Sequence, residues 1–406
     1  MNKPTLLVII GDSLLPITNG GRLRIYNLTI NLLKNWNIDI ICLKPEEEEY
    51  QNQIKTIFRN VYFVERFSLN TNRQKESYLK KIKHLVLPPK NLYALPVNYL
   101  AQFNYLIQHQ IPIQSYKAIL VFGASTFGFY LSNLQQNNIV CDAADAMSLY
   151  LKSIASAKMI GGREWLSLYY AYLYNLRWEK KYLAKCRKII AISERDKKWL
   201  SKTIAKSNIY VVENGVNTDY FTPQVAQSGI AKGLIIFTGV MGYEPNHDAM
   251  IYCLKKIWPL IKKRAPEAKL KIVGRYPKPE LINLAQKQKD VEVTGEVEDI
   301  RKAVKGAQVF LCPMRIGAGM KNKILEALAM GIPVVTTSEG ATGIEFEHGK
   351  VGYIADTPES LTHYTVNLLT ERNKWEKLSK AARRLVTEKY SWQAKAEKLS
   401  TILLID

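Results

Sequence analysis

The sequence predicts an α/β protein built from two Rossmann-like domains. Its 406 residues are enough for two domains of ordinary size. Short apolar runs alternate with helical stretches before residue 213 and again after residue 233, a pattern typical of parallel sheets covered by helices on both faces. Residues 213–233 form the expected linker, and its second half, 224–233, has no apolar periodicity. We therefore expect an N-terminal domain at 1–223, joined by a final helix at 388–406, and a C-terminal domain at 224–387.

The N-terminal domain begins with an expected strand at 6–10 and a loop, Gly11–Gly21. A helix follows, with Gly20 and Gly21 at its start and Arg24 just inside it. Two glycines at a helix N-terminus suit a phosphate or the close approach of a substrate. The loop lacks the G-x-G-x-x-G spacing, which argues against a nicotinamide cofactor. Further strands are expected at 38–43, 61–64, 118–122, 139–142, 187–192 and 208–212.

The C-terminal domain repeats this alternation. Strands are expected at 234–239, 270–273, 291–294 and 309–312, with a helix at 246–264 after the first of them. Glycines stand where three of these strands end, namely Gly239, Gly274 and Gly295. Ligands of open parallel sheets bind beyond the carboxyl ends of the strands, so we expect a ligand in a cleft where two such domains face one another.

The most informative stretch is Arg315–Val335. Gly317 and Gly319 free the backbone to turn tightly, and from Met320 onward the apolar residues have helical spacing. A strand, a glycine loop and a helix N-terminus together aim backbone N–H groups at an anion, most often phosphate.

Charged side chains strengthen this interpretation. Arg315, Lys321 and Lys323 add positive charge, and Glu326 lies too far into the helix to cap it. A carboxylate at that place would suit the hydroxyls of a sugar. The alternative is an ordinary turn between strand and helix with a surface glutamate.

The composition points to a globular protein with an anionic partner. The formal charge of +21 suggests nucleic acid, an acidic membrane surface or phosphorylated substrates, although a lysine-rich surface can also serve solubility alone. Five scattered cysteines without a C-x-x-C pair favour buried thiols in a reducing compartment over disulfides or zinc. The apolar run near residue 10 is too short for a signal peptide, and no stretch approaches the length of a membrane span. We expect a cytoplasmic protein.

Two segments, 67–105 and 152–206, combine basic and aromatic residues. Such a combination suits the headgroup layer of an anionic membrane, single-stranded nucleic acid, or rings packed inside a domain. The membrane surface is the favoured interpretation, with the protein peripheral on the inner face of the plasma membrane.

Four motifs in this order resemble the retaining, sugar-nucleotide-dependent GT-B glycosyltransferases called family four, or "glycosyl transferases group one". They are the Gly20–Gly21 loop, the linker 211–223 (VVENGVNTDYFTP), the pair 237–239 and 271–275 (FTG and KIVGR), and 323–335 (KILEALAMGIPVV). Residues 390–404 resemble the family's last helix, which crosses back to the N-terminal domain. Asn246, together with Asp142, Asp145 and Ser148, resembles a bacterial subgroup associated with exopolysaccharide assembly.

The resemblance implies transfer of a sugar from a nucleoside diphosphate, such as a UDP- or GDP-sugar, with retention at the anomeric centre and without a metal or other cofactor. The C-terminal domain would hold the donor and the N-terminal domain a glycan or lipid-linked acceptor. Glu326 matches the glutamate that holds the donor ribose, Gly20 and Gly21 the loop over the diphosphate, and Glu296 and Val297 the loop that meets the base. The remaining expected donor residues are Gly239, Asn246, Gly274, Arg275, Gly317, Gly319, Met320 and Lys323, and Arg24 and Asp142 are expected on the acceptor side.

The sequence departs from the family at three places. Ala318 replaces a glutamate eight positions before Glu326, and residues 240–246 lack the usual arginine and lysine pair. We expect Arg315 and Lys321 to supply the counter-charge of the diphosphate as catalytic residues instead. Ala144 stands where a histidine is common, so the adjacent Asp145 either contacts a sugar hydroxyl or caps the next helix.

Three alternatives remain open. A sugar-nucleotide epimerase of the same fold would need no acceptor and no broad basic face. A nucleic-acid-binding or DNA-glycosylating protein would co-purify with nucleic acid. A non-catalytic paralogue would bind the donor without turnover.

Overall fold

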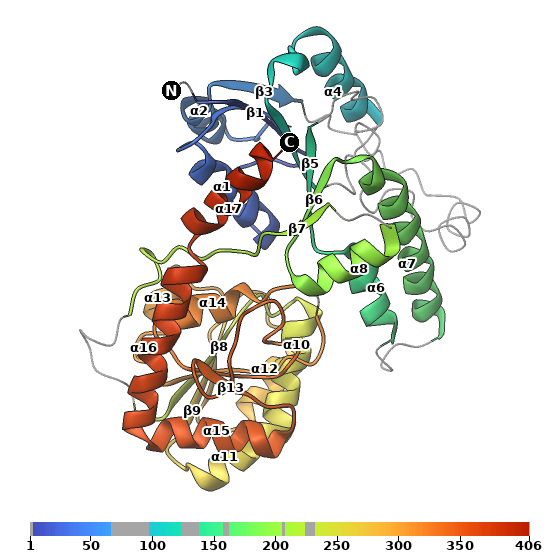
Figure 1. Ribbon diagram of the computed structural model, residues 1–406. Coiled ribbons are helices and arrows are strands. Elements are labelled where there is room, and N and C mark those ends of the chain that lie inside the picture. Colours follow the sequence, from blue (N-terminus) through green and yellow to red (C-terminus); the bar gives the residue numbers. More distant parts are fainter. Residues whose placement is uncertain are drawn as a thin grey trace. The chain divides into compact units, whose positions relative to one another are not determined.

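The computed structural model describes residues 3–65, 97–123, 138–156, 162–204, 208–223, 232–317 and 319–405. The chain divides into two compact units, unit 1 comprising 1–213 with 395–406 and unit 2 comprising 214–394. Each unit is an open, all-parallel sheet with helices packed against it (Figure 1). The predicted class, two Rossmann-like α/β domains, is therefore confirmed. Of the basic and aromatic segment predicted at 67–105, residues 67–96 lie outside the described part of the chain.

The sheet of unit 1 has the strand order β3-β2-β1-β4-β5-β6-β7. Its register pairs Leu6 with Ile38 on one side and with Ala118 on the other. Nearly every residue of these strands is apolar because both faces of a parallel sheet are covered. The strands are β1 Thr5–Ile10, β2 Asn37–Leu43, β3 Asn60–Val64, β4 Ala118–Phe122, β5 Ile139–Ala144, β6 Lys188–Ala191 and β7 Ile209–Val211. The helices are α1 Gly20–Leu32, α2 Glu48–Ile57, α4 Val97–His109, α6 Met147–Ser156, α7 Gly162–Tyr182, α8 Glu194–Ile204 and α17 Trp392–Leu404.

The sheet of unit 2 has the strand order β10-β9-β8-β11-β12-β13. The predicted helix 246–264 is continuous, but a π-helical turn at Cys253–Ile257 joins its two parts. The strands are β8 Leu234–Thr238, β9 Lys269–Val273, β10 Val291–Val293, β11 Val309–Cys312, β12 Val334–Thr336 and β13 Gly352–Ile354. The helices are α10 Glu244–Tyr252, α11 Trp258–Arg264, α12 Pro279–Gln286, α13 Ile300–Ala303, α14 Asn322–Ala329, α15 Pro358–Thr370 and α16 Arg372–Lys389.

The boundaries of the units differ from the predicted ones because residues 214–223 are anchored on unit 2. The Val216 amide donates to the Tyr390 carbonyl oxygen at 2.7 Å, and a side chain on Gly215 would overlap Trp392. Near the C-terminus the chain returns to unit 1, where the Trp36 indole N–H donates to the Ser400 hydroxyl at 2.8 Å. The last helix therefore returns to the N-terminal unit, as expected from the resemblance.

The interior of the chain contains the cysteines. All five are buried and free, as predicted, and burial raises the pKa of the Cys42 thiol to about 12. None of the helices within the described residues has the length and apolar character needed to cross a membrane.

Candidate functional site

The loop between β11 and α14 has the conformation that its glycines predict. Gly317 and Gly319 have positive φ angles, 139° and 69°, which glycine adopts readily and other residues rarely do. Helix α14 begins at Asn322, and its N-cap residue, Lys321, makes no side-chain capping hydrogen bond. The first amides of α14 therefore receive no acceptor from the cap, which suits an anionic ligand. Met320 in this loop is buried against the core of unit 2.

Lys323 directs its ammonium group to the carboxyl end of β8. Its Nζ donates to the Asn246 side-chain oxygen and lies 4.5 Å from the centre of the Phe237 ring. Burial lowers the pKa of Lys323 to about 8, although the nearby Cys312 and Glu326 oppose this shift. Lys323 forms no ion pair with a carboxylate of the described residues. Its charge is thus available to an incoming anion.

Glycines let the backbone approach closely around this lysine. A side chain on Gly274 would overlap the Gly239 carbonyl oxygen, and one on Gly239 would meet Asn246 and Lys323. The Asn246 side-chain amide donates to the Val240 carbonyl oxygen at 2.9 Å, which fixes its oxygen toward Lys323. The Gly274 amide donates to the Gly295 carbonyl oxygen at 3.1 Å. The ends of β8, β9 and β10 are therefore held together at one edge of the sheet.

Glu326 lies one turn after Lys323 on α14. Burial raises the pKa of its carboxyl group to about 7, opposed by the positive charge of Lys323. Among the described residues its carboxylate has no hydrogen-bond or ion-pair partner. Glu326 is half-buried, and a ligand hydroxyl could donate to a carboxylate that no donor of the described residues reaches.

Arg315 and Lys321, the expected counter-charges of the diphosphate, are both paired with carboxylates. Arg315 bonds Asp248 through two nitrogens, at 3.2 and 2.5 Å, and its guanidinium lies 4.4 Å from the centre of the Tyr252 ring. Lys321 is buried, donates to the Gly319 carbonyl oxygen at 2.8 Å and lies 3.4 Å from Glu339. Their catalytic role stays a prediction. Nothing in the sequence spacing connects Asp248 or Glu339 to this loop, so sequence reasoning missed both.

Exposed side chains surround the same edge of the sheet. Tyr276, which directly follows Arg275, is 65% exposed with a φ of 59°, and Tyr243 is 44% exposed. A side chain on Gly242 would lie 3.3 Å from Tyr276, so the two loops touch. Of the pair expected to meet a base, Glu296 is exposed, whereas Val297 packs against the core. No motif in the sequence predicts either tyrosine at this site.

In unit 1 the glycines predicted at a helix start do begin α1. Asn19 caps this helix by accepting from the Arg22 amide at 2.9 Å, and Gly20 and Gly21 are its first two residues. Arg22 in turn forms two hydrogen bonds with Asp12, at 2.9 and 2.7 Å. The N-terminus of α1 is therefore a fixed structure, and its role over a diphosphate stays a prediction.

Arg24 and Asp142, expected on the acceptor side, are buried against one another. Their ion pair is 2.9 Å long, and Arg24 also donates to the Val212 carbonyl oxygen at 2.8 Å. Both side chains are nearly inaccessible to solvent. The pair joins α1, β5 and the strand end after β7, so it stabilises unit 1, and a contact with an acceptor stays a prediction.

Asp145 lies in the turn between β5 and α6. The amides at the start of α6 are bonded by other carboxylates, since Asp196 accepts from Ala146 at 3.1 Å and Glu179 accepts from Ser148 at 2.9 Å. Burial raises the pKa of Glu179, although hydrogen bonds from Ser148 oppose this shift. Asp145 is therefore not needed to cap these two amides.

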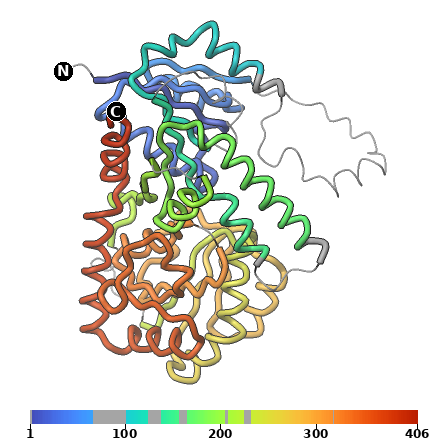
Figure 2. The backbone as a smooth tube through the Cα atoms, turned by 45° about the vertical axis from the view of Figure 1, so that its right-hand side comes forward, coloured from blue at the N-terminus to red at the C-terminus, as the bar shows by residue number. Residues whose placement is uncertain are grey.

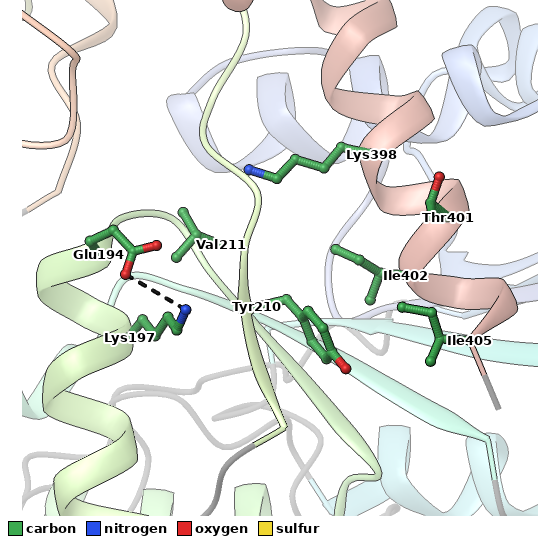
Figure 3. Close-up of a pocket in the computed structure, with 8 residues that line it drawn as sticks. All are labelled: Glu194, Lys197, Tyr210, Val211, Lys398, Thr401, Ile402 and Ile405. Carbon is green, nitrogen blue, oxygen red and sulfur yellow. Dashed lines mark ion pairs between the residues drawn. The ribbon is translucent and has the colours of Figure 1, made fainter.

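A hollow of about 380 Å³ lies elsewhere in unit 1, between β7, the start of α8 and α17 (Figure 3). Val211, Ile402 and Ile405 line it with apolar groups. At its rim Lys197 lies 3.7 Å from Glu194, and Lys398 lies 3.2 Å from Glu213. These lysines are already matched by glutamates, and none of the predicted site residues lines the hollow.

Residues 232–371 match the family model described as Glycosyl transferases group 1. Over the whole chain the sequence is similar to an uncharacterized 44.6 kDa protein in the cps region of Klebsiella pneumoniae, with 24% identity covering 89% of this chain and 90% of that protein. It is also similar to the phosphatidyl-myo-inositol mannosyltransferase of Mycobacterium leprae, with 25% identity covering 55% of this chain and 60% of the relative.

Solved structures with a similar fold cover nearly the whole chain. The sucrose-phosphate synthase from Thermosynechococcus elongatus has a TM-score of 0.68 with 15% identity, covering 98% of both chains. Anabaena Alr3699/HepE in complex with UDP has a TM-score of 0.67 with 12% identity, covering 98% of this chain and 99% of that one. At these identities the likeness establishes the fold, which is the GT-B arrangement of two Rossmann-like domains.

Proposed function

We propose that this protein is a retaining, metal-independent glycosyltransferase, on the premise that residues 232–371 match the family model described as Glycosyl transferases group 1. It transfers a sugar from a nucleoside diphosphate sugar to a glycan or lipid-linked acceptor in the synthesis of bacterial cell-surface polysaccharide. The relative from a cps region and the mannosyltransferase relatives support this class of reaction. The proposed location is the cytoplasm, at the inner face of the plasma membrane.

The observation that carries the proposal is that two charged side chains of α14, Lys323 and Glu326, each lack a partner of opposite charge or a hydrogen-bond donor among the described residues. Lys323 offers a positive charge without a carboxylate partner among the described residues, and Glu326 offers a carboxylate without a donor. These two groups lie about one helical turn apart and match two adjacent parts of a nucleoside diphosphate. Lys323 suits the diphosphate, and Glu326 suits the ribose hydroxyls.

The chemistry that this edge of the sheet supports is departure of a diphosphate. As the bond between the sugar and the phosphate breaks, positive charge develops on the sugar and negative charge on the leaving group. Lys323, the amides at the start of α14, and the paired cations Arg315 and Lys321 all stabilise the second charge. In the proposed mechanism the leaving phosphate takes the proton of the acceptor hydroxyl, so retention does not depend on a second carboxylate.

A two-stage experiment tests the proposal. A thermal-shift panel of UDP- and GDP-sugars identifies the donor, and a transfer assay with that donor then follows the product in the presence and absence of EDTA. We expect one donor class to stabilise the protein, activity to survive EDTA, and ¹H NMR to show the donor's anomeric configuration in the product.

Other outcomes would identify the alternatives. Donor binding without turnover on any acceptor would indicate a non-catalytic paralogue, and conversion of the sugar without an acceptor would indicate an epimerase. If no nucleotide sugar changes the melting temperature, the proposed donor site is wrong.

A further inference from the structure

Helix α7 carries an exposed face that is aromatic in its first half and basic in its second half. Trp165, Leu166, Tyr169 and Tyr170 are 40%, 48%, 40% and 51% exposed. Because a helix turns every 3.6 residues, positions 166, 170, 177 and 181 lie on the same side of it. We call this side the aromatic–basic face, and its exposed members are Trp165, Leu166, Tyr169, Tyr170, Tyr174, Arg177, Lys180 and Lys181.

The opposite side of α7 is fixed to unit 1. Asn175, Glu179 and Tyr182 are buried, and α7 packs along α6 (Figure 2). Glu179 accepts hydrogen bonds from both the amide and the hydroxyl of Ser148, at 2.9 and 2.5 Å. This glutamate is the only acidic residue in the sequence from 165 to 182, so its orientation leaves the outward side of that stretch without negative charge.

We propose that the aromatic–basic face binds the surface of an anionic lipid bilayer. Monomeric proteins rarely expose contiguous large apolar side chains without a partner for them. Tryptophan and tyrosine favour the headgroup layer, where the ring is buried and its polar group stays hydrated. Arg177, Lys180 and Lys181 provide charge complementary to acidic headgroups, and the formal charge of +21 acts in the same direction.

The arrangement of the rings distinguishes a bilayer from single-stranded nucleic acid. Trp165 and Tyr169 stack on each other, with centroids 5.2 Å apart and planes 7° apart. This stack leaves each ring only its outer face for a base, whereas insertion between headgroups requires only apolar bulk. Charge also opposes a second copy of this chain, because two basic faces repel.

The inference deepens the proposed function by naming the surface where a lipid-linked acceptor would be met. Membrane binding is measured without a sugar or a nucleotide. A protein that transfers sugar but does not bind vesicles would contradict this inference alone, and one that binds vesicles but transfers no sugar would contradict the proposed function alone.

Vesicle flotation tests the inference, with vesicles of phosphatidylcholine alone and with vesicles of phosphatidylcholine mixed with the anionic lipid phosphatidylglycerol. We expect binding to the anionic vesicles only, weakened by salt. A lysine close to an acidic surface contributes about fivefold in affinity, so K180E/K181E, which removes two lysines and adds two negative charges, should bind at least about 30-fold more weakly. The matched control is K256E/K263E, which makes the same charge change on exposed lysines of unit 2.

Two further variants test insertion of the aromatic half. Leu166→Ser with Tyr170→Ser should weaken binding at high salt, and quenching by brominated lipid should be smaller for Trp165→Phe than for the native chain. Equal loss in K180E/K181E and in K256E/K263E would overturn the inference in favour of non-specific charge. Binding of single-stranded DNA but not vesicles, or a dimer that K180E/K181E dissociates, would also overturn it.

Discussion

A methyl group added at Gly239 would lie 2.9 Å from the Lys323 ammonium nitrogen. The absence of a side chain at residue 239 is therefore what lets Lys323 reach the end of β8. The Asn246 amide nitrogen would lie 2.8 Å from the same methyl group, so both partners of this contact depend on the glycine. The backbone there has a φ of 157°, which side chains rarely adopt.

Gly239→Ala should therefore displace Lys323 and Asn246. We expect the free energy of unfolding to fall by about 1–3 kcal/mol and the affinity for UDP or GDP to fall at least about tenfold. Gly349→Ala is the control, because Gly349 also has a positive φ but nothing lies within 4 Å of its added methyl group. That control should lose about 1 kcal/mol and keep its nucleotide affinity. Equal nucleotide binding by both variants would contradict the assigned site.

Lys323 should make nucleotide binding depend on pH near 8. Burial lowers its pKa to about 8, so its charge is lost as the pH rises through that value. We expect the affinity for UDP or GDP to fall between pH 7 and 9 and to be weak at all pH values in Lys323→Met. Isothermal titration calorimetry measures both. A flat pH profile in the native protein would exclude Lys323 as the counter-charge.

Glu326 should make the protein less stable as the pH rises. Its pKa is about 7 in the folded protein against 4.5 for an exposed glutamate, so the folded state binds more protons between these values. The free energy of unfolding therefore falls as the pH rises through this window, by about 3 kcal/mol when it is complete. Glu326→Gln has no carboxyl group to titrate, so its free energy of unfolding should not show this loss. Between about pH 4.5 and pH 8 the variant should therefore lose less stability than the native protein. Urea unfolding at both pH values measures the difference.

Arg315→Ala should separate function from stability. The Arg315 side chain is 43% exposed but that of Asp248 only 8%, so removing Arg315 leaves a nearly buried carboxylate unpaired and should cost about 1–3 kcal/mol of stability. If Arg315 stabilises the leaving diphosphate, turnover at a temperature where the variant is folded should fall at least about 100-fold. The control is Arg384→Ala, which breaks an exposed pair with Glu388 on α16. Unchanged turnover in Arg315→Ala would reject its catalytic role.

The sequence predicted the fold and the glycine loops well, because these depend on local patterns. Apolar runs of strand length identified the core strands, and Gly317 and Gly319 do have positive φ angles. Pairing between distant side chains was not predictable. Asp248 and Arg315 are 67 residues apart, and only the parallel sheet brings their elements together. For the same reason no sequence pattern indicates that Arg24 and Asp142, expected to face an acceptor, bond each other in the interior.

The Arg24–Asp142 pair should prove essential to the stability of unit 1. Both side chains are almost fully buried, so removing one partner leaves an unpaired charge in the interior. Arg24→Met should therefore lower the free energy of unfolding by about 3–5 kcal/mol. The double variant Arg24→Met with Asp142→Leu should recover most of that loss, because no charge is then left unpaired. Urea unfolding of the native protein and the three variants, including Asp142→Leu alone, completes the cycle. If the single variants are as stable as the native protein but lose affinity for an acceptor, the pair acts in binding, as the sequence predicted, and not in holding α1 to β5.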